Sequence, residues 1–154
     1  MAKYDLDTIR HSTAHLMAHA VSRIYKTHNP QFGIGPVIEN GFYYDIDLDV
    51  KIHDEDLEKI EKVMQEIIDE KLPVQRKVFT RDESVEFWKQ KNQPLKVEVV
   101  SGIPQGEEIS CYEQGEFIDL CRGPHVENTG HLPKFFKLQS CLLYTSPSPR
   151  DLST

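Results

Sequence analysis

The 154-residue chain has few of the features that mark secreted, membrane-spanning or broadly nucleic-acid-binding proteins. Its three cysteines form an odd, sparse set, which argues against a disulfide scaffold and predicts a reducing, cytoplasmic location. No apolar run approaches the roughly 18 residues of a membrane span, and no charged-then-apolar leader opens the sequence. The formal net charge of −7 excludes a general polycationic binder, so any contact with nucleic acid has to be local.

The negative charge is concentrated in one segment. Residues 51–72 contain four lysines and eight acidic side chains, which is typical of the solvated face of a helix. The rest of the chain is nearly balanced and can carry a small basic site. With 38% hydrophobic and 28% charged residues, the composition is that of one folded domain.

Apolar periodicity predicts three helices. The first covers residues 7–28, with Asp7 as its N-cap, and its apolar arc leaves Ser12 and His19 on the polar side. The second covers residues 54–72 and ends at a proline. The third runs to residue 91 after a capping box, Thr80 with Glu83.

Hairpin signals dominate the remaining segments. One hairpin is predicted around the turn Asn40-Gly41 and a second around Gln114-Gly115. Further strands are predicted over residues 74–79, 96–100 and 135–138. The expected fold class is therefore α+β, a mostly antiparallel sheet packed with a long N-terminal helix and two further helices in a single domain.

Two short motifs could supply chemistry. His11 and His15 stand four residues apart on the first helix, a spacing that can aim two imidazoles at one metal ion or one water, although it also arises by chance. Cys121 and His125 flank a tight Arg-Gly-Pro turn and suit either a soft divalent ion or a nucleophilic pair. Together the motifs make a much stronger signal than either alone.

Three further side chains are candidates, each with a structural alternative. Asp119 precedes Cys121 by two residues, so both face the same side of an extended strand, or it is a hairpin-edge carboxylate. Lys96 opens the otherwise apolar segment LKVEVV and could equally be a surface lysine. Tyr44 follows the first hairpin turn and could simply pack in the core.

The chain resembles the second additional domain shared by threonyl- and alanyl-tRNA synthetases in four segments: IRHSTAHLMAHAV, IGPVIENGFYYDID, LKVEVV and FIDLCRGPHVENTG. The resemblance covers residues 5–139, and DLCRGPHV is closest to the threonyl branch. It implies an editing domain that hydrolyses, by attack of water, the ester of seryl-tRNA(Thr). The residues that match the catalytic and cleft positions of the family are His11, His15, Lys96, Asp119, Cys121, His125 and Tyr44.

The resemblance also suggests a role for each position. His11 and His15 would orient or deprotonate the water, and Lys96 would stabilise charge on the ester oxygen or the ribose. Asp119 would bind the serine amine or hydroxyl, with Tyr44 lining the cleft. Cys121 and His125 would complete the pocket wall, and Cys121 would not act as a covalent nucleophile.

The resemblance implies that editing requires no cofactor. Zinc remains a candidate metal that the quartet His11, His15, Cys121 and His125 could bind. The implied partner is the acceptor end of tRNA, with no membrane. The parent enzyme would be a homodimer that ligates threonine to tRNA using ATP, through a catalytic domain that we do not find in this sequence.

Two departures from the family predict a truncated fragment. Family members often begin with a ubiquitin-like domain, whereas Met1 lies ten residues ahead of His11. The last segment, CLLYTSPSPRDLST, resembles translated adapter or vector sequence. We therefore expect an editing domain over residues 1–140 and a non-native, disordered tail over residues 141–154.

Three other functions are compatible with the same residues. The chain could be a free-standing deacylase that acts in trans, or a non-enzymatic binding module stabilised by zinc at the quartet. A hydrolase with Cys121 as its nucleophile is the third.

Overall fold

The computed structural model describes residues 4–33, 37–38, 41–42, 44, 46–134 and 138. The helices are α1 (Leu6–Ile24), α2 (Asp54–Glu70), α3 (Arg81–Gln90) and α4 (Pro94–Ser101), with 3-10 turns η1 (Lys26–His28) and η2 (Thr129–His131). The strands are β1 (Gln31–Phe32), β2 (Val37–Ile38), β3 (Gly41–Phe42), β4 (Ile46–Asp47), β5 (Val74–Phe79), β6 (Ile109–Gln114) and β7 (Phe117–Leu120). No described helix is long and apolar enough to cross a membrane.

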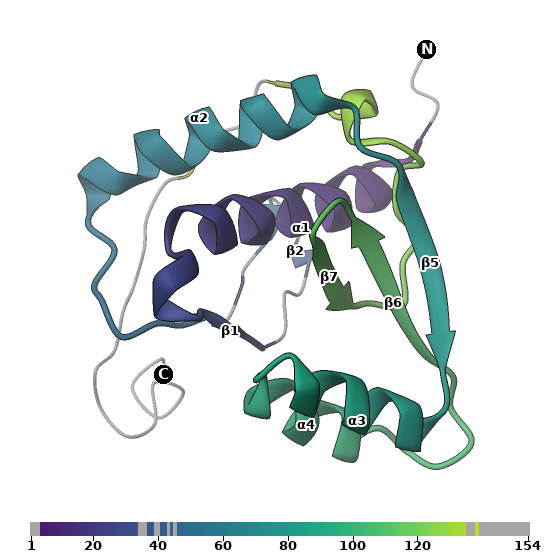
Figure 1. Ribbon diagram of the computed structural model, residues 1–154. Coiled ribbons are helices and arrows are strands. Elements are labelled where there is room, and N and C mark those ends of the chain that lie inside the picture. The colour runs from purple at the N-terminus through teal and green to yellow at the C-terminus, as the bar shows by residue number, and fades with distance from the viewer. Residues whose placement is uncertain are drawn as a thin grey trace.

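The two long helices form one layer, with α2 packed over α1 (Figure 1). The buried face of α2 is the predicted one, namely Leu57, Ile60, Met64, Ile67 and Ile68. The N-cap of α1 is Asp5, which accepts a hydrogen bond from the Thr8 N–H at 2.8 Å, rather than the predicted Asp7. The helix also ends earlier than predicted, because residues 26–28 form a 3-10 turn.

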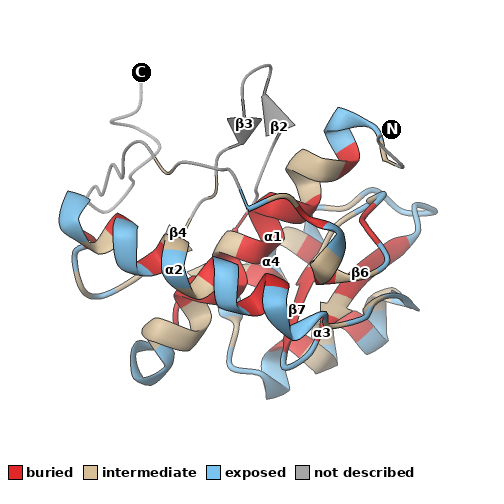
Figure 2. Ribbon diagram, turned by 90° about the horizontal axis from the view of Figure 1, so that it is seen from above, coloured by how far each residue is buried: buried red, intermediate tan, exposed pale blue. Residues whose placement is uncertain are grey.

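The prediction that Ser12 and His19 lie on an exposed polar side of α1 is wrong. Ser12 and His19 are buried, as is His15, because α1 lies between α2 and the strands and so has neighbours on most sides. The sequence pattern showed only the apolar arc and gave no sign that polar side chains on the opposite side would find buried partners. Figure 2 shows this buried centre along α1, with exposed residues on the outer faces of α2 and α3.

A three-stranded antiparallel sheet, in the order β5-β6-β7, lies beside the helical layer (Figure 1). The second predicted hairpin is confirmed, because β6 and β7 are both strands and pair with each other. The register pairs Gln114 with Phe117, so the turn residues are Gly115 and Glu116, one position later than predicted. Gly115 has a φ of 58°, a conformation that favours glycine.

A helical pair, α3 and α4, packs at one end of this sheet. The capping box of Thr80 and Glu83 starts α3 as predicted. The strand predicted over residues 96–100 is wrong, because this segment forms α4, with Pro94 in its first turn. The β-branched valines suggested a strand, yet Lys96 and Val100 are both buried at the four-residue spacing of a helix.

Two small strand pairs complete the described structure. β2 pairs with β3 in the predicted hairpin, but Gly41 pairs with Ile38 and so belongs to the strand instead of the turn. β1 pairs with β4. The strand predicted over residues 135–138 falls mostly outside the described residues. Every described strand pair is antiparallel, which confirms the α+β class, although with three helices beyond α1 instead of two.

Candidate functional site

Three predicted site residues meet beneath the surface. His15 projects from the middle of α1 toward Cys121 and His125, which lie on the loop that follows β7. One ligand atom from each lies within 4.8 Å of the others. The rings of His15 and His125 are 4.4 Å apart, and His125 Nε2 is 3.1 Å from Cys121 Sγ. We call these three residues the imidazole–thiol cluster.

His11 stands at the edge of the imidazole–thiol cluster. It lies one helical turn before His15, and its ring centre is 6.2 Å from that of His125. Its side chain is only partly buried, whereas His15 and His125 are buried. The predicted quartet is therefore a compact group of three with a fourth imidazole facing outward.

The loop that carries Cys121 and His125 is shaped by a glycine and a tyrosine. Gly123 has a φ of 79°, and a methyl group at its Cα would overlap the Tyr112 hydroxyl. Tyr112, on β6, also packs its ring 4.2 Å from that of His125. The Gly123 N–H lies 3.3 Å from Cys121 Sγ, which folds the loop back on the thiol.

The other three predicted residues form a buried polar chain behind the imidazole–thiol cluster. Lys96 and Asp119 are an ion pair with side chains only 2% and 1% exposed. Lys96 Nζ also donates to the carbonyl of Gly33 at 2.8 Å, and the Tyr44 hydroxyl donates to Asp119. The chain approaches the imidazole–thiol cluster through Tyr44, whose ring centre is 6.3 Å from that of His15.

Burial sets the protonation states of the site. Desolvation, followed by the charge of Lys96, lowers the pKa of His15 to about 3. Desolvation, followed by His15, lowers the pKa of His125 to about 2, so both imidazoles are neutral at pH 7. Burial raises the pKa of the Cys121 thiol. Burial also raises the pKa of Asp119, and the ammonium of Lys96 opposes that rise.

The donor set of the imidazole–thiol cluster fits zinc in its chemistry. Two imidazoles and one thiol are ligands that zinc accepts, and three protein ligands leave a position for water. His15 Nδ1 is buried and has no hydrogen-bond partner among the described residues, so one donor atom is available. His11, the fourth predicted ligand, is not part of this group.

Sequence reasoning missed two residues that contact His125. Tyr112 gave no signal beyond its place in a strand. Ser12 lies between the two motif histidines and is buried with its hydroxyl 3.3 Å from His125 Nδ1. Its spacing of three residues from His15 places both on one side of a helix, which is the signal that could have identified it.

A surface cavity of about 280 Å³ opens next to the Cys121 loop. Its lining includes Arg76 and Arg122, each paired with a glutamate, and Ser110. The Ser110 hydroxyl donates to the carbonyl of Cys121 at 2.7 Å. The cavity therefore adjoins the site at its loop and is not lined by the histidines.

Part of this chain matches a known domain family. Residues 109–148, which include Asp119, Cys121 and His125, match the family described as the threonyl and alanyl tRNA synthetase second additional domain. This match confirms the resemblance drawn from the sequence motifs, because it contains the cysteine–histidine loop.

The similarity extends through most of the chain to one kind of enzyme. The chain is 56% identical over 135 residues to the threonine–tRNA ligase of Anoxybacillus flavithermus, a match covering 88% of this chain and 20% of that enzyme. It is 53% identical over 136 residues to that of an Exiguobacterium species, and 56% over 133 residues to that of Aromatoleum aromaticum. The chain is thus homologous to one segment of threonine–tRNA ligases and spans about a fifth of their length.

Proposed function

We propose that this chain is an editing domain that hydrolyses the ester of seryl-tRNA(Thr). The observation that carries the proposal is the convergence of His15 with Cys121 and His125, in a chain homologous to threonine–tRNA ligases. By the same similarity, the full-length relative would ligate threonine to tRNA with ATP and act as a homodimer in the cytoplasm. The acceptor end of tRNA is the proposed partner.

Hydrolysis at this site needs a positioned water and a proton acceptor. His15 is neutral and buried, with an unpaired Nδ1, so it can hold the water by accepting a hydrogen bond. His11 is partly exposed and stands at the edge of the imidazole–thiol cluster, so we assign it the water's proton. The water oxygen then bonds to the ester carbonyl carbon, the bond to the ribose oxygen breaks, and that oxygen regains a proton.

The buried polar chain supplies charge stabilisation and substrate contacts. Among the described residues, Lys96 uses its ammonium for Asp119 and the Gly33 carbonyl, which leaves one N–H for the developing oxyanion or the ribose. Asp119 accepts from Lys96, Tyr44 and the Leu120 N–H. Its remaining lone pair would bind the serine amine or hydroxyl, with Tyr44 as the adjoining wall.

The physical need for such a site comes from the similarity of the two amino acids. Serine lacks one methyl group of threonine, and a synthetic pocket gains only about 1–3 kcal/mol from one such group. A second, hydrolytic site that excludes the extra methyl by shape multiplies the discrimination. The editing site should therefore cleave seryl-tRNA and leave threonyl-tRNA intact.

The test is deacylation of seryl-tRNA(Thr) by the full 154-residue chain. His11→Ala and His15→Ala should each lower the rate by about 10²–10⁴-fold, the usual contribution of acid–base catalysis. His28→Ala is the matched control, because His28 is an exposed histidine paired with Asp49, away from the imidazole–thiol cluster. Unchanged rates in both variants, or equal cleavage of threonyl-tRNA(Thr), would contradict the proposal.

Contact with tRNA should be weak in this chain alone. A net charge of −7 gives little attraction for a polyanion, so the contact is confined to the acceptor end. A nanomolar complex at physiological salt, measured by filter binding, would contradict this.

Zinc and the thiol define the competing functions. A zinc ion held by His15, Cys121 and His125 would act as a Lewis acid or, in a purely structural site, as a fold stabiliser. Stoichiometric metal whose chelation unfolds the chain, in a protein that shows no deacylase activity, would favour the binding module. A Cys121→Ala variant that loses all activity and a trapped acyl-thiol in the wild type would favour the cysteine hydrolase. A free-standing deacylase would show the same chemistry in trans on tRNA charged by another enzyme.

A further inference from the structure

Ser12 links the two halves of the candidate site. It lies on α1 between His11 and His15, and it is only 2% exposed. Its hydroxyl oxygen is 2.9 Å from the backbone nitrogen of Val126 and 3.3 Å from Nδ1 of His125. A single buried hydroxyl therefore docks the loop end onto the helix and contacts one ring of the imidazole–thiol cluster.

Counting donors and acceptors fixes the direction of the hydrogen bond from Val126 and favours one direction for the hydrogen bond with His125. A backbone N–H can only donate, so Ser12 Oγ accepts from Val126. Among the residues that the structure describes, the only other hydrogen-bond partner of this hydroxyl is His125 Nδ1. Nδ1 is the one acceptor found there for the hydroxyl hydrogen, so the arrangement that satisfies this hydrogen has Ser12 donating to Nδ1.

The state of Nδ1 determines the state of the opposite nitrogen. A neutral imidazole carries one proton, so an Nδ1 that accepts a hydrogen bond leaves the proton on Nε2. His125 Nε2 lies 3.1 Å from Cys121 Sγ, close enough for this N–H to donate to the sulfur. Cys121 Sγ then accepts from both His125 and the Gly123 N–H.

We propose that Ser12 is a positioning residue that holds His125 in the tautomer protonated on Nε2, through its hydroxyl bridge between Val126 and Nδ1. The inference deepens the proposed function and rests on it for its catalytic consequence. His125 Nε2 then cannot accept a proton from the attacking water, so that role stays with the histidines of α1. His125 instead orients the thiol and keeps the pocket wall rigid.

The tautomer can be measured without any reaction. Nitrogen-detected NMR of the ¹⁵N-labelled full chain at pH 7 with EDTA should show His125 with an unprotonated Nδ1 and a protonated Nε2, assigned by their loss in His125→Asn. Ser12→Ala should shift the ring toward the form protonated on Nδ1, and Ser12→Thr should retain the wild-type form. A wild-type ring protonated on Nδ1, or a Ser12→Ala ring with an unchanged tautomer, would overturn the inference.

Deacylation of seryl-tRNA(Thr) then tests the catalytic consequence. By analogy with residues that orient metal-bound histidines, whose loss lowers activity about 10–100-fold, Ser12→Ala should fall in that range and Ser12→Thr should stay near wild type. Ser22→Ala is the matched control, because the Ser22 hydroxyl on the same helix donates to the carbonyl of His19. A full rate in Ser12→Ala would overturn the positioning role.

The two hypotheses fail in different ways. If the wild-type chain cleaves no seryl-tRNA, the proposed function fails while the NMR result still decides the tautomer. If Ser12→Ala does not fold, the wild-type spectrum still tests the inference, because a ring protonated on Nδ1 overturns it.

Discussion

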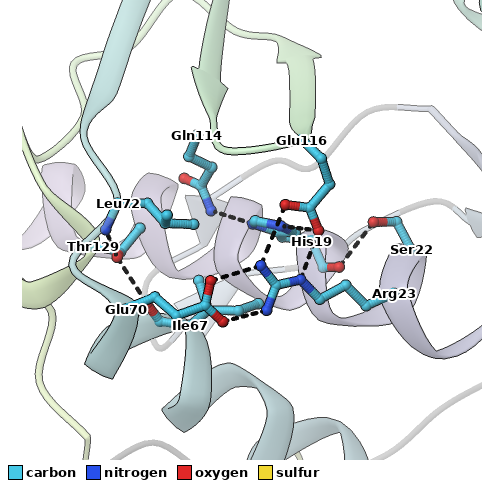
Figure 3. Close-up of polar contacts among 9 residues, drawn as sticks. All are labelled: His19, Ser22, Arg23, Ile67, Glu70, Leu72, Gln114, Glu116 and Thr129. Atoms are coloured by element: carbon cyan, nitrogen blue, oxygen red, sulfur yellow. Dashed lines mark hydrogen bonds and ion pairs between the residues drawn. The ribbon is translucent and has the colours of Figure 1, made fainter.

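Two ion-pair networks of the molecule differ in burial and teach different lessons. Lys96 and Asp119 form a pair inside the protein, with side chains 2% and 1% exposed. Arg23 forms the other network at the surface, where it binds Glu70 of α2 and Glu116 of the β6–β7 turn (Figure 3). We call Arg23, Glu70 and Glu116 the arginine clamp; its side chains are 27%, 39% and 57% exposed.

The arginine clamp ties three elements together and is backed by His19. The Gln114 amide lies 3.1 Å from His19 Nδ1, and His19 Nε2 lies 3.1 Å from the Glu116 carboxylate (Figure 3). Such a network stabilises the fold at a small desolvation penalty, because its side chains remain partly hydrated. A buried pair gains little over apolar residues of the same size, since desolvation offsets its attraction. Ions in the core beside two imidazoles are therefore better explained by chemistry than by stability.

The largest expected effect comes from breaking the buried pair. Lys96→Met leaves Asp119 buried without its cation and should lower the free energy of unfolding by about 3–5 kcal/mol. The double variant Lys96→Met/Asp119→Leu should recover much of that stability in urea titrations and remain inactive on seryl-tRNA. An active double variant would remove Lys96 and Asp119 from the proposed mechanism.

Acid should next destabilise the interior. The pKa of His15 is about 3 in the folded chain against an ordinary value of 6.5, so below pH 6.5 the unfolded chain binds a proton that the folded chain refuses. Its contribution to stability is present above pH 6.5 and is lost as the pH falls toward 3. We therefore expect the difference in the free energy of unfolding between wild type and His15→Gln to change by about 2 kcal/mol, against wild type, between pH 6.5 and 5. Urea titrations at the two pH values measure this change. A constant difference would show that His15 is hydrated.

Removing the arginine clamp should have a smaller effect. Arg23→Gln should lower the free energy of unfolding by about 1 kcal/mol, because the lost pairs are partly exposed. Deacylation of seryl-tRNA should stay at the wild-type rate, since the clamp contacts no residue of the imidazole–thiol cluster. A lost rate with intact folding would show that the β6–β7 turn transmits strain to the site.

The smallest expected effect is the loss of the arginine clamp's stabilisation at low pH. The hydrogen bond from Arg23, followed by those from the Glu116 backbone and from His19, lowers the pKa of Glu116 to about 2 from an ordinary 4.5, against the opposing effect of burial. This stabilisation is present above pH 4.5 and disappears as the pH falls toward 2. The difference in thermal stability between wild type and Arg23→Gln should therefore close over that window. A difference that persists at pH 2 would contradict a stabilising role for the two carboxylates of the clamp.

Much of the fold was predictable because local signals agreed with the final environment. The buried face of α2, the capping box of Thr80 and the antiparallel hairpins follow from periodicity, side-chain capping and turn residues. The segment that became α4 was not predictable in this way. Its valines favour a strand, and the deciding factors were Pro94 and a burial pattern that exists only in the folded chain.

The site divides along the same line. The spacing of His11, His15, Cys121 and His125 predicted a shared site, and the structure brings three of them together. The burial of Lys96 depends on the docking of distant segments, which no local pattern encodes. For Ser12 the one local sign is its three-residue spacing from His15, and its contact with Val126 again depends on docking. Whether these residues act on an ester stays a prediction for the assays above.

The close packing of the loop over residues 121–125 on β6 depends on one residue, Gly123. Its Cα lies against the Tyr112 hydroxyl. The loop can pack this closely on β6 only because glycine has a hydrogen atom in place of a side chain. Any larger residue would overlap the Tyr112 side chain, so the loop or the tyrosine that packs on His125 would have to move, and the thiol and its neighbouring imidazole would lose their present positions together. A substitution that alters no reacting group would thus disable all of them at once, which makes position 123 a better monitor of site integrity than the histidines themselves.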